Sequence, residues 1–146
     1  MKSVVEMEIN VPKEKLAALF ADPNNNIVWM DDLEKLEYIS GDPGMPGSRY
    51  RMVSKAGPGK MAFVATVTCR NLPDETALQL EASNVTVAVR DKFAAVSPQT
   101  TKLTSEEVFT FKGLFNKMFG FLAQKTIRNV HRRHMDSFKR FAESHG

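Results

Sequence analysis

A stripe of apolar side chains runs through the C-terminal part of the chain at helical spacing. Its members recur at steps of three or four residues: Phe119, Ala123, Ile127, Val130, His134, Phe138 and Phe141. Such steps place side chains on one face of an α-helix. The pattern predicts one long helix from about Leu114 to Ser144. Its apolar stripe needs a broad partner surface.

The upstream sequence supplies that surface, because its apolar residues alternate with a period of two. In residues 2–9, for example, Val5, Met7 and Ile9 share one side, as in a half-exposed strand. Similar alternation marks residues 33–40, 48–55, 61–71, 78–82, 85–95 and 103–111. A short helix is expected at Lys13–Ala21 after Pro12, and a second helical turn at Ile27–Met30. The order predicts an α+β domain with a seven-stranded antiparallel sheet.

Length and cysteine content limit the class of protein. The 146 residues fit one domain, residues 1–146, that is large enough to bury a core. Cys69 is the only cysteine, which excludes an intramolecular disulfide and favours a reducing compartment. The N-terminal residues lack a signal-peptide core, and no window is apolar enough to span a membrane. We expect a soluble, cytoplasmic monomer or homodimer.

Positive charge is concentrated at the C-terminal end. The formal net charge is only +3, but eight Lys or Arg residues from Lys112 onward face only Asp136 and Glu143. The pattern is typical of a solvated helix face, although weak attraction to an anionic membrane surface is left open. Zinc-finger spacing and aromatic RNA-binding motifs are absent, so no nucleic-acid partner is expected. The glycine-rich loops lack phosphate-binding patterns, and no cofactor is expected.

Two carboxylates form the sharpest polar signal. Asp91 and Glu107 lie in phase with apolar residues of the last two strands. A hairpin that pairs Ala95 with Leu103 would place these acids opposite each other, whereas a one-residue slip would turn one outward. Paired carboxylates on an apolar face shift each other's pKa and suit acid–base chemistry. Alternatively, a nearby Lys or Arg neutralises them, or one of them faces water.

Histidine provides a third, weaker catalytic candidate. His134 lies on the apolar stripe, with His131 one turn before it. Such a pair could begin a zinc site, but zinc needs three or four ligands and the sequence offers no third. We therefore expect no metal, and predict that His134 is buried and hydrogen-bonded to the sheet. No Ser-His or Cys-His arrangement indicates covalent catalysis.

The order of elements carries a family resemblance. Together with the stretch from Val11-Pro12 through Trp29 and the Gly41-Asp42-Pro43-Gly44…Gly47 loop, it resembles the START-related lipid-transfer and polyketide cyclase/dehydrase superfamily (SRPBCC). This is the helix-grip fold shared with plant pathogenesis-related allergens. The resemblance implies a curved antiparallel sheet around a long C-terminal helix, with two short helices between strands 1 and 2. It also implies a cavity that takes apolar or aromatic small molecules.

The resemblance implies a set of cavity-facing residues. They are Trp29, Tyr38, Tyr50, Met52, Phe63, Phe93, Phe109, Met118, Phe119, Leu122, Ile127 and Val130. Met and aromatic side chains suit such a pocket, but they suit a closed core equally well. The leading hypothesis is binding or transport of a small hydrophobic or amphipathic ligand. The alternatives are a cofactor-free cyclase or dehydratase that uses Asp91, Glu107 or His134, and a co-chaperone-like interaction module.

Overall fold

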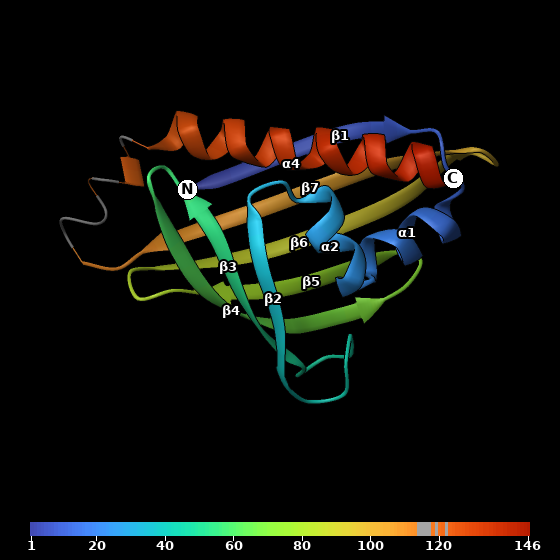
Figure 1. Cartoon of the computed structure of the whole chain (residues 1–146). Coiled ribbons are helices and arrows are strands. Elements are labelled where there is room, and N and C mark those ends of the chain that lie inside the picture. The colour runs from blue at the N-terminus through green and yellow to red at the C-terminus, as the bar shows by residue number, and fades with distance from the viewer. Residues whose placement is uncertain (114–117, 119, 122) are drawn as a thin grey trace.

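The computed structural model describes residues 1–113, 118, 120, 121 and 123–146. A single seven-stranded antiparallel sheet has the strand order β1-β7-β6-β5-β4-β3-β2 (Figure 1). The predicted α+β class, the seven strands and the two short helices after the first strand are confirmed. The elements are β1 (Lys2–Ile9), α1 (Lys13–Ala21), α2 (Pro23–Trp29), β2 (Leu33–Ser40), β3 (Arg49–Ala56), β4 (Gly59–Asn71), β5 (Glu75–Glu81), β6 (Val85–Ser97), β7 (Thr100–Phe111) and α4 (Gln124–His145).

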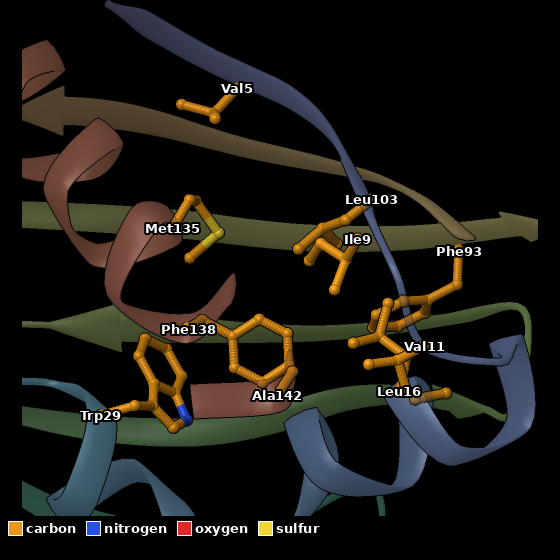
Figure 2. Close-up of a cluster of buried hydrophobic side chains, with 11 residues drawn as sticks. Val5, Ile9, Val11, Leu16, Trp29, Phe93, Leu103, Met135, Phe138 and Ala142 are labelled. Carbon is orange, nitrogen blue, oxygen red and sulfur yellow. The ribbon is translucent and has the colours of Figure 1, made fainter. Parts of the chain in front are cut away.

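Helix α4 lies along one face of the curved sheet, beside β1 and close to α1 and α2 (Figure 1). Its anchor is Phe138, which is fully buried. The ring packs edge-on against two other rings. Its centroid lies 4.9 Å from that of Phe20 and 5.2 Å from that of Trp29. Figure 2 shows Met135, Phe138 and Ala142 of α4 meeting residues of β1, β7 and α1. This aromatic cluster fixes the C-terminal half of α4 against the two short helices.

Helix α1 has the predicted bounds, Lys13–Ala21, but the predicted starts of the other two helices need correction. Helix α2 begins at Pro23 rather than near Ile27. The Asp22 carboxylate accepts a hydrogen bond from the Asn24 amide, and proline occupies the first turn, so an apparent chain break is a capped helix start. Helix α4 begins at Gln124 rather than near Leu114. Residues 114–117 of the expected helix lie outside the described part of the chain.

The last hairpin has a register two residues away from the one considered above. Phe93 pairs with Leu103, Asp91 with Ser105, and Val89 with Glu107. Asp91 and Glu107 are therefore diagonal neighbours rather than direct partners. A shift of two residues preserves the side to which each side chain points. Both acids consequently remain on the face that α4 covers.

Candidate functional site

A cavity of about 150 Å³ lies between the sheet and the helices. An engineered apolar cavity of about this size binds benzene, so the space suits one aromatic ring. Its wall combines residues of β2 to β7 with residues of α1 and α2 and one turn of α4. The apolar part of the wall includes Trp29, Met30, Leu36, Tyr50, Met52, Ala65, Val67, Leu78, Leu80, Val89 and Met135.

Two carboxyl groups lie on this apolar wall. Asp91 on β6 is 2% exposed, and the side chain of Glu107 on β7 is 18% exposed. No described residue donates a hydrogen bond to Oδ1 of Asp91. Neither acid forms an ion pair with a described Lys or Arg. The sequence left open that a Lys or Arg neutralises these acids or that one of them faces water. Neither alternative holds among the described residues.

Burial changes the protonation of both acids. Removal from water raises the pKa of Asp91 to about 7; the Ser105 hydroxyl opposes the rise, and the charge of Glu107 adds to it. Burial likewise raises the pKa of Glu107 to about 7, against the opposing charge of His134. Near neutral pH each carboxyl group is thus balanced between its acid and its base form. That balance suits proton transfer.

His131 is the buried histidine of α4, although the sequence pointed to it only as the neighbour of His134 in a possible zinc pair. Its Nδ1 lies 2.7 Å from Ser3 Oγ on β1, and its Nε2 lies 2.9 Å from Ser105 Oγ on β7. Burial, helped by the charge of His134, lowers the pKa of His131 to about 4, so the ring is neutral at pH 7. No motif in the sequence indicated that these two serines meet a histidine, and the expectation that no Ser-His pair acts in covalent catalysis stays a prediction. The only signal was that Ser3 and Ser105 share a phase with apolar strand residues.

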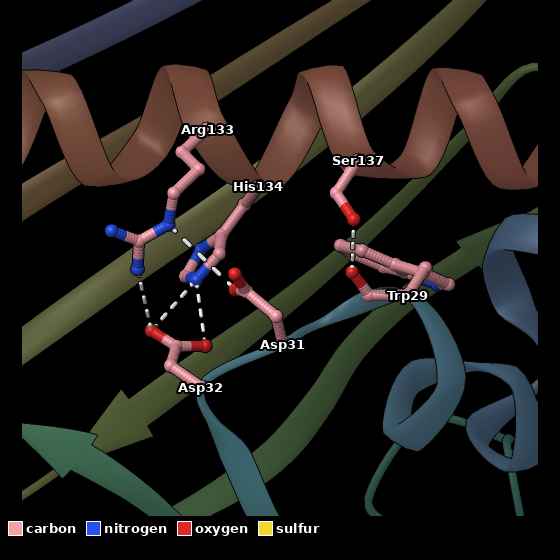
Figure 3. Close-up of polar contacts among 6 residues, drawn as sticks. All are labelled: Trp29, Asp31, Asp32, Arg133, His134 and Ser137. Carbon is pink, nitrogen blue, oxygen red and sulfur yellow. Dashed lines mark hydrogen bonds and ion pairs between the residues drawn. The ribbon is translucent and has the colours of Figure 1, made fainter.

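His134 is half-buried, and its hydrogen-bond partner differs from those of His131. Its Nε2 lies 2.8 and 2.9 Å from the two carboxylate oxygens of Asp32, just before β2 (Figure 3). The predicted bond from a buried His134 to the sheet is therefore wrong. Partial burial would raise the pKa of Asp32, but the His134 hydrogen bond and the charges of His134 and Arg133 lower it.

Asp31, Asp32 and His134 bring potential metal-ligand atoms within 4.8 Å of one another. Arg133 reaches both acids, however, with N–O distances of 3.7 Å to Asp31 and 3.5 Å to Asp32 (Figure 3). The single positive charge of the guanidinium group compensates part of the two negative charges. The arrangement is a salt-bridge cluster that ties α4 to the loop before β2.

The predicted site residues divide into several groups. Asp91, Glu107 and His134 line the cavity, as do Trp29, Tyr50 and Met52; their roles stay predictions. Phe119 and Leu122 lie outside the described residues. The other predicted residues do not belong to the described cavity wall: Tyr38 and Met118 are 54% and 66% exposed, Phe93 is buried in the core, and Phe63, Phe109, Ile127 and Val130 are partly buried.

Solved structures share the whole architecture. The Thermus thermophilus protein TTHA0849 superposes with a TM-score of 0.84 at 15% identity, over 100% of this chain and 99% of that one. A START superfamily protein from Mycobacterium smegmatis gives 0.80 at 13% identity, over 99% of each chain. The chain has the START-related helix-grip fold. Ara h 8.0201 also has this architecture, with a TM-score of 0.69 at 14% identity over 99% of this chain and 98% of that one.

Among the comparisons with known proteins, only those with solved structures find the helix-grip fold. No protein-family model matches the chain, and no curated protein matches its sequence. Likeness at this level of identity establishes the fold and leaves the chemistry to the site. Among the described residues, no helix combines the length with the hydrophobicity that a bilayer crossing requires.

Proposed function

We propose that the protein binds a small hydrophobic or amphipathic molecule in the cavity between the sheet and α4. The observation that supports this most directly is the cavity itself: a mostly apolar space that contains a few buried polar groups. Ligand pockets typically combine an apolar wall with a small number of placed polar groups. The fold of the solved START superfamily protein is consistent with this function.

An entrance is suggested by a second hollow that adjoins the cavity. Both spaces are lined by Pro23 of α2, Gly44 of the loop after β2, Tyr50 and Arg70. The Gly44 amide donates a hydrogen bond to the Tyr50 hydroxyl at 2.7 Å. Arg70 donates to the Gly44 carbonyl at 3.3 Å. These two hydrogen bonds hold the loop after β2 against Tyr50 and Arg70, between the hollow and the cavity. If they break and the loop moves, the passage from solvent to the cavity becomes wider.

Filling the cavity tests the proposal. Ala65 is 4% exposed and lies on the cavity wall in β4. We expect Ala65→Phe to place a ring in the space that the ligand needs and to weaken binding of propylbenzene, a neutral probe, by about tenfold or more, equivalent to roughly 1.4 kcal/mol. Isothermal titration calorimetry of both proteins measures the change.

The matched control is Ala62→Phe, in the same strand. Ala62 is exposed and lies in the opposite phase from Ala65, on the outer face of the sheet. Propylbenzene affinity should stay within about twofold of wild type in this variant. Failure of the wild-type protein to bind the probe, or equal affinity in the Ala65→Phe variant, would reject the cavity as a ligand site. Thermal melts of each variant verify that it is folded.

An acid–base enzyme without a cofactor is the second candidate. The observation that favours it is the pair of carboxyl groups, Asp91 and Glu107, whose pKa values burial raises to about 7 on the wall of a small apolar cavity. In its ionised form such a group removes a proton from carbon next to a carbonyl. In its protonated form the partner hydrogen-bonds the developing enolate oxygen.

Proton exchange in phenylacetone tests this candidate without knowledge of the natural substrate. In D₂O, exchange of the protons next to the carbonyl is followed by NMR. We expect the protein to accelerate exchange, and the Asp91→Asn and Glu107→Gln variants to lose about tenfold or more of that acceleration. Exchange at the buffer rate, or at one rate in all three proteins, would exclude this enzyme class.

A further inference from the structure

No described Lys or Arg forms an ion pair with either carboxyl group of the cavity. Burial of an unpaired carboxylate costs several kcal/mol unless a cation or hydrogen-bond donors compensate it. Oδ1 of Asp91 has no donor among the described residues. Nε2 of His131 lies 3.8 Å from Oε2 of Glu107, but burial keeps this ring neutral at pH 7. The cavity therefore contains two acceptor groups and little to satisfy them.

Three described basic groups in or beside the cavity, His131, His134 and Arg70, form contacts with other residues. His131 is held between the hydroxyl groups of Ser3 and Ser105. His134 is bonded to both carboxylate oxygens of Asp32. Arg70 lies at the rim and donates to the Gly44 carbonyl. None of these three contacts supplies a proton or a positive charge to Oδ1 of Asp91.

We propose that Asp91 and Glu107 select a ligand that has an apolar, ring-sized body and a protonated amine. This deepens the proposed ligand-binding function and rests on it. The ammonium group would donate to Oδ1 of Asp91 and compensate both acids, while the body occupies the space beside Met52, Leu80 and Val89. A charge-assisted hydrogen bond is about twice as strong as a neutral one. An apolar, poorly hydrated wall strengthens it further.

The charge of the ligand decides between an amine and an alcohol. Both groups donate a hydrogen bond, but only the ammonium group offsets the negative charge of two neighbouring carboxylates. A ligand carboxylate would add a third negative charge to the same wall. The order of affinity expected from these charges is amine, alcohol, then carboxylate.

The preference depends on pH with a definite sign. Asp91 and Glu107 lose their protons as pH rises through about 7, and attraction to an ammonium group requires the ionised forms. The other titratable or charged groups around them are His131 and His134 on α4, Asp32 before β2, Tyr50 on β3, and Cys69 and Arg70 on β4. Affinity for the amine should rise between pH 5.5 and 8.5, and affinity for the alcohol should change little.

Four probes test the proposal by calorimetry. Propylbenzene, 2-phenylethanol and 2-phenylethylamine have nearly equal shape, and 3-phenylpropanoate is longer and carries a carboxylate. At pH 8.5 we expect the amine to bind about tenfold tighter than the alcohol, and the carboxylate to bind most weakly of the polar three. In Asp91→Asn and Glu107→Gln the ratio of amine to alcohol affinity should fall to within about threefold. Propylbenzene should still bind to these variants.

The matched control is Glu106→Gln, because Glu106 neighbours Glu107 in β7 but pairs with Lys2 at 3.3 Å on the outer face. This variant should keep the wild-type ratio. Equal binding of amine and alcohol by the wild type, tighter binding of the carboxylate, or a ratio unchanged in both cavity variants would overturn the amine proposal. If propylbenzene binds and the amine does not, the amine proposal fails and the ligand-binding function stands. If none of the four binds, both fail.

Discussion

Replacing Asp91 with asparagine is expected to make the protein more stable than wild type at pH 8, by a few kcal/mol. Burial raises the pKa of Asp91 from 3.8 to about 7 in the folded state. Between these values the unfolded chain releases a proton that the folded protein retains, so the free energy of unfolding falls as pH rises. The loss is on the order of 1 kcal/mol for each pH unit. The asparagine amide does not titrate, so the Asp91→Asn variant does not lose stability in this way as pH rises.

Urea unfolding at pH 4.5, 5.5, 6.5, 7.5 and 8.5 measures the effect. The stability difference between Asp91→Asn and wild type should grow up to about pH 7 and then level off. Glu107 contributes in the same direction, since burial raises its pKa as well. His131 acts oppositely: its pKa is lowered to about 4, so its contribution is lost as pH falls below 6.5. Glu106→Gln is the control. A difference that does not vary with pH would contradict the burial of an unpaired acid.

Truncation of Phe138 to alanine is expected to destabilise the protein by about 3–5 kcal/mol. The ring is fully buried and packs against Phe20 and Phe141. It also packs against Trp29 (Figure 2). Its removal leaves a cavity where α1, α2 and α4 meet. Few neighbours can close this space, because the three elements are joined by aromatic contacts of fixed geometry. The midpoint of urea unfolding, at constant slope, measures the loss.

Phe121→Ala is the matched control, because it removes the same type of side chain from a position where that side chain is 71% exposed. Its truncation should change the free energy of unfolding by no more than about 0.5 kcal/mol. A loss below about 1 kcal/mol in Phe138→Ala would show that the aromatic cluster does not anchor α4. A lower slope in that variant would instead indicate a more compact unfolded state or a populated intermediate.

The strands were predictable because their signal is local. Alternation of apolar and polar residues over eight positions located β1 at Lys2–Ile9, and the same reasoning applied to β2 at Leu33–Ser40. Helix starts were less predictable. The Asp22-Pro23-Asn24 sequence is equally suited to a turn and to a capped helix, and only the packing of Trp29 against Phe138 decides for α2.

The candidate acids illustrate how far a sequence pattern reaches. Alternation in each strand determines which face a side chain occupies, and this holds for any register shift of two residues. The sequence therefore placed Asp91 and Glu107 on the correct face of the sheet, although the strand pairing that it suggested was wrong. Which residue stands opposite which depends on the turn between β6 and β7, at Ser97 and Thr100. The diagonal relation of the two acids follows from that turn.

By itself, the sequence determined the class of fold, the order of the strands along the chain and the two acids on the inner face, because these depend on local periodicity. Tertiary structure alone decided the partners of the histidines. Ser3 and His131 are 128 residues apart and meet only because β1 pairs with β7 beneath α4. His134 likewise meets Asp32 across 102 residues. Contacts between distant segments depend on how whole elements pack, which no local pattern specifies.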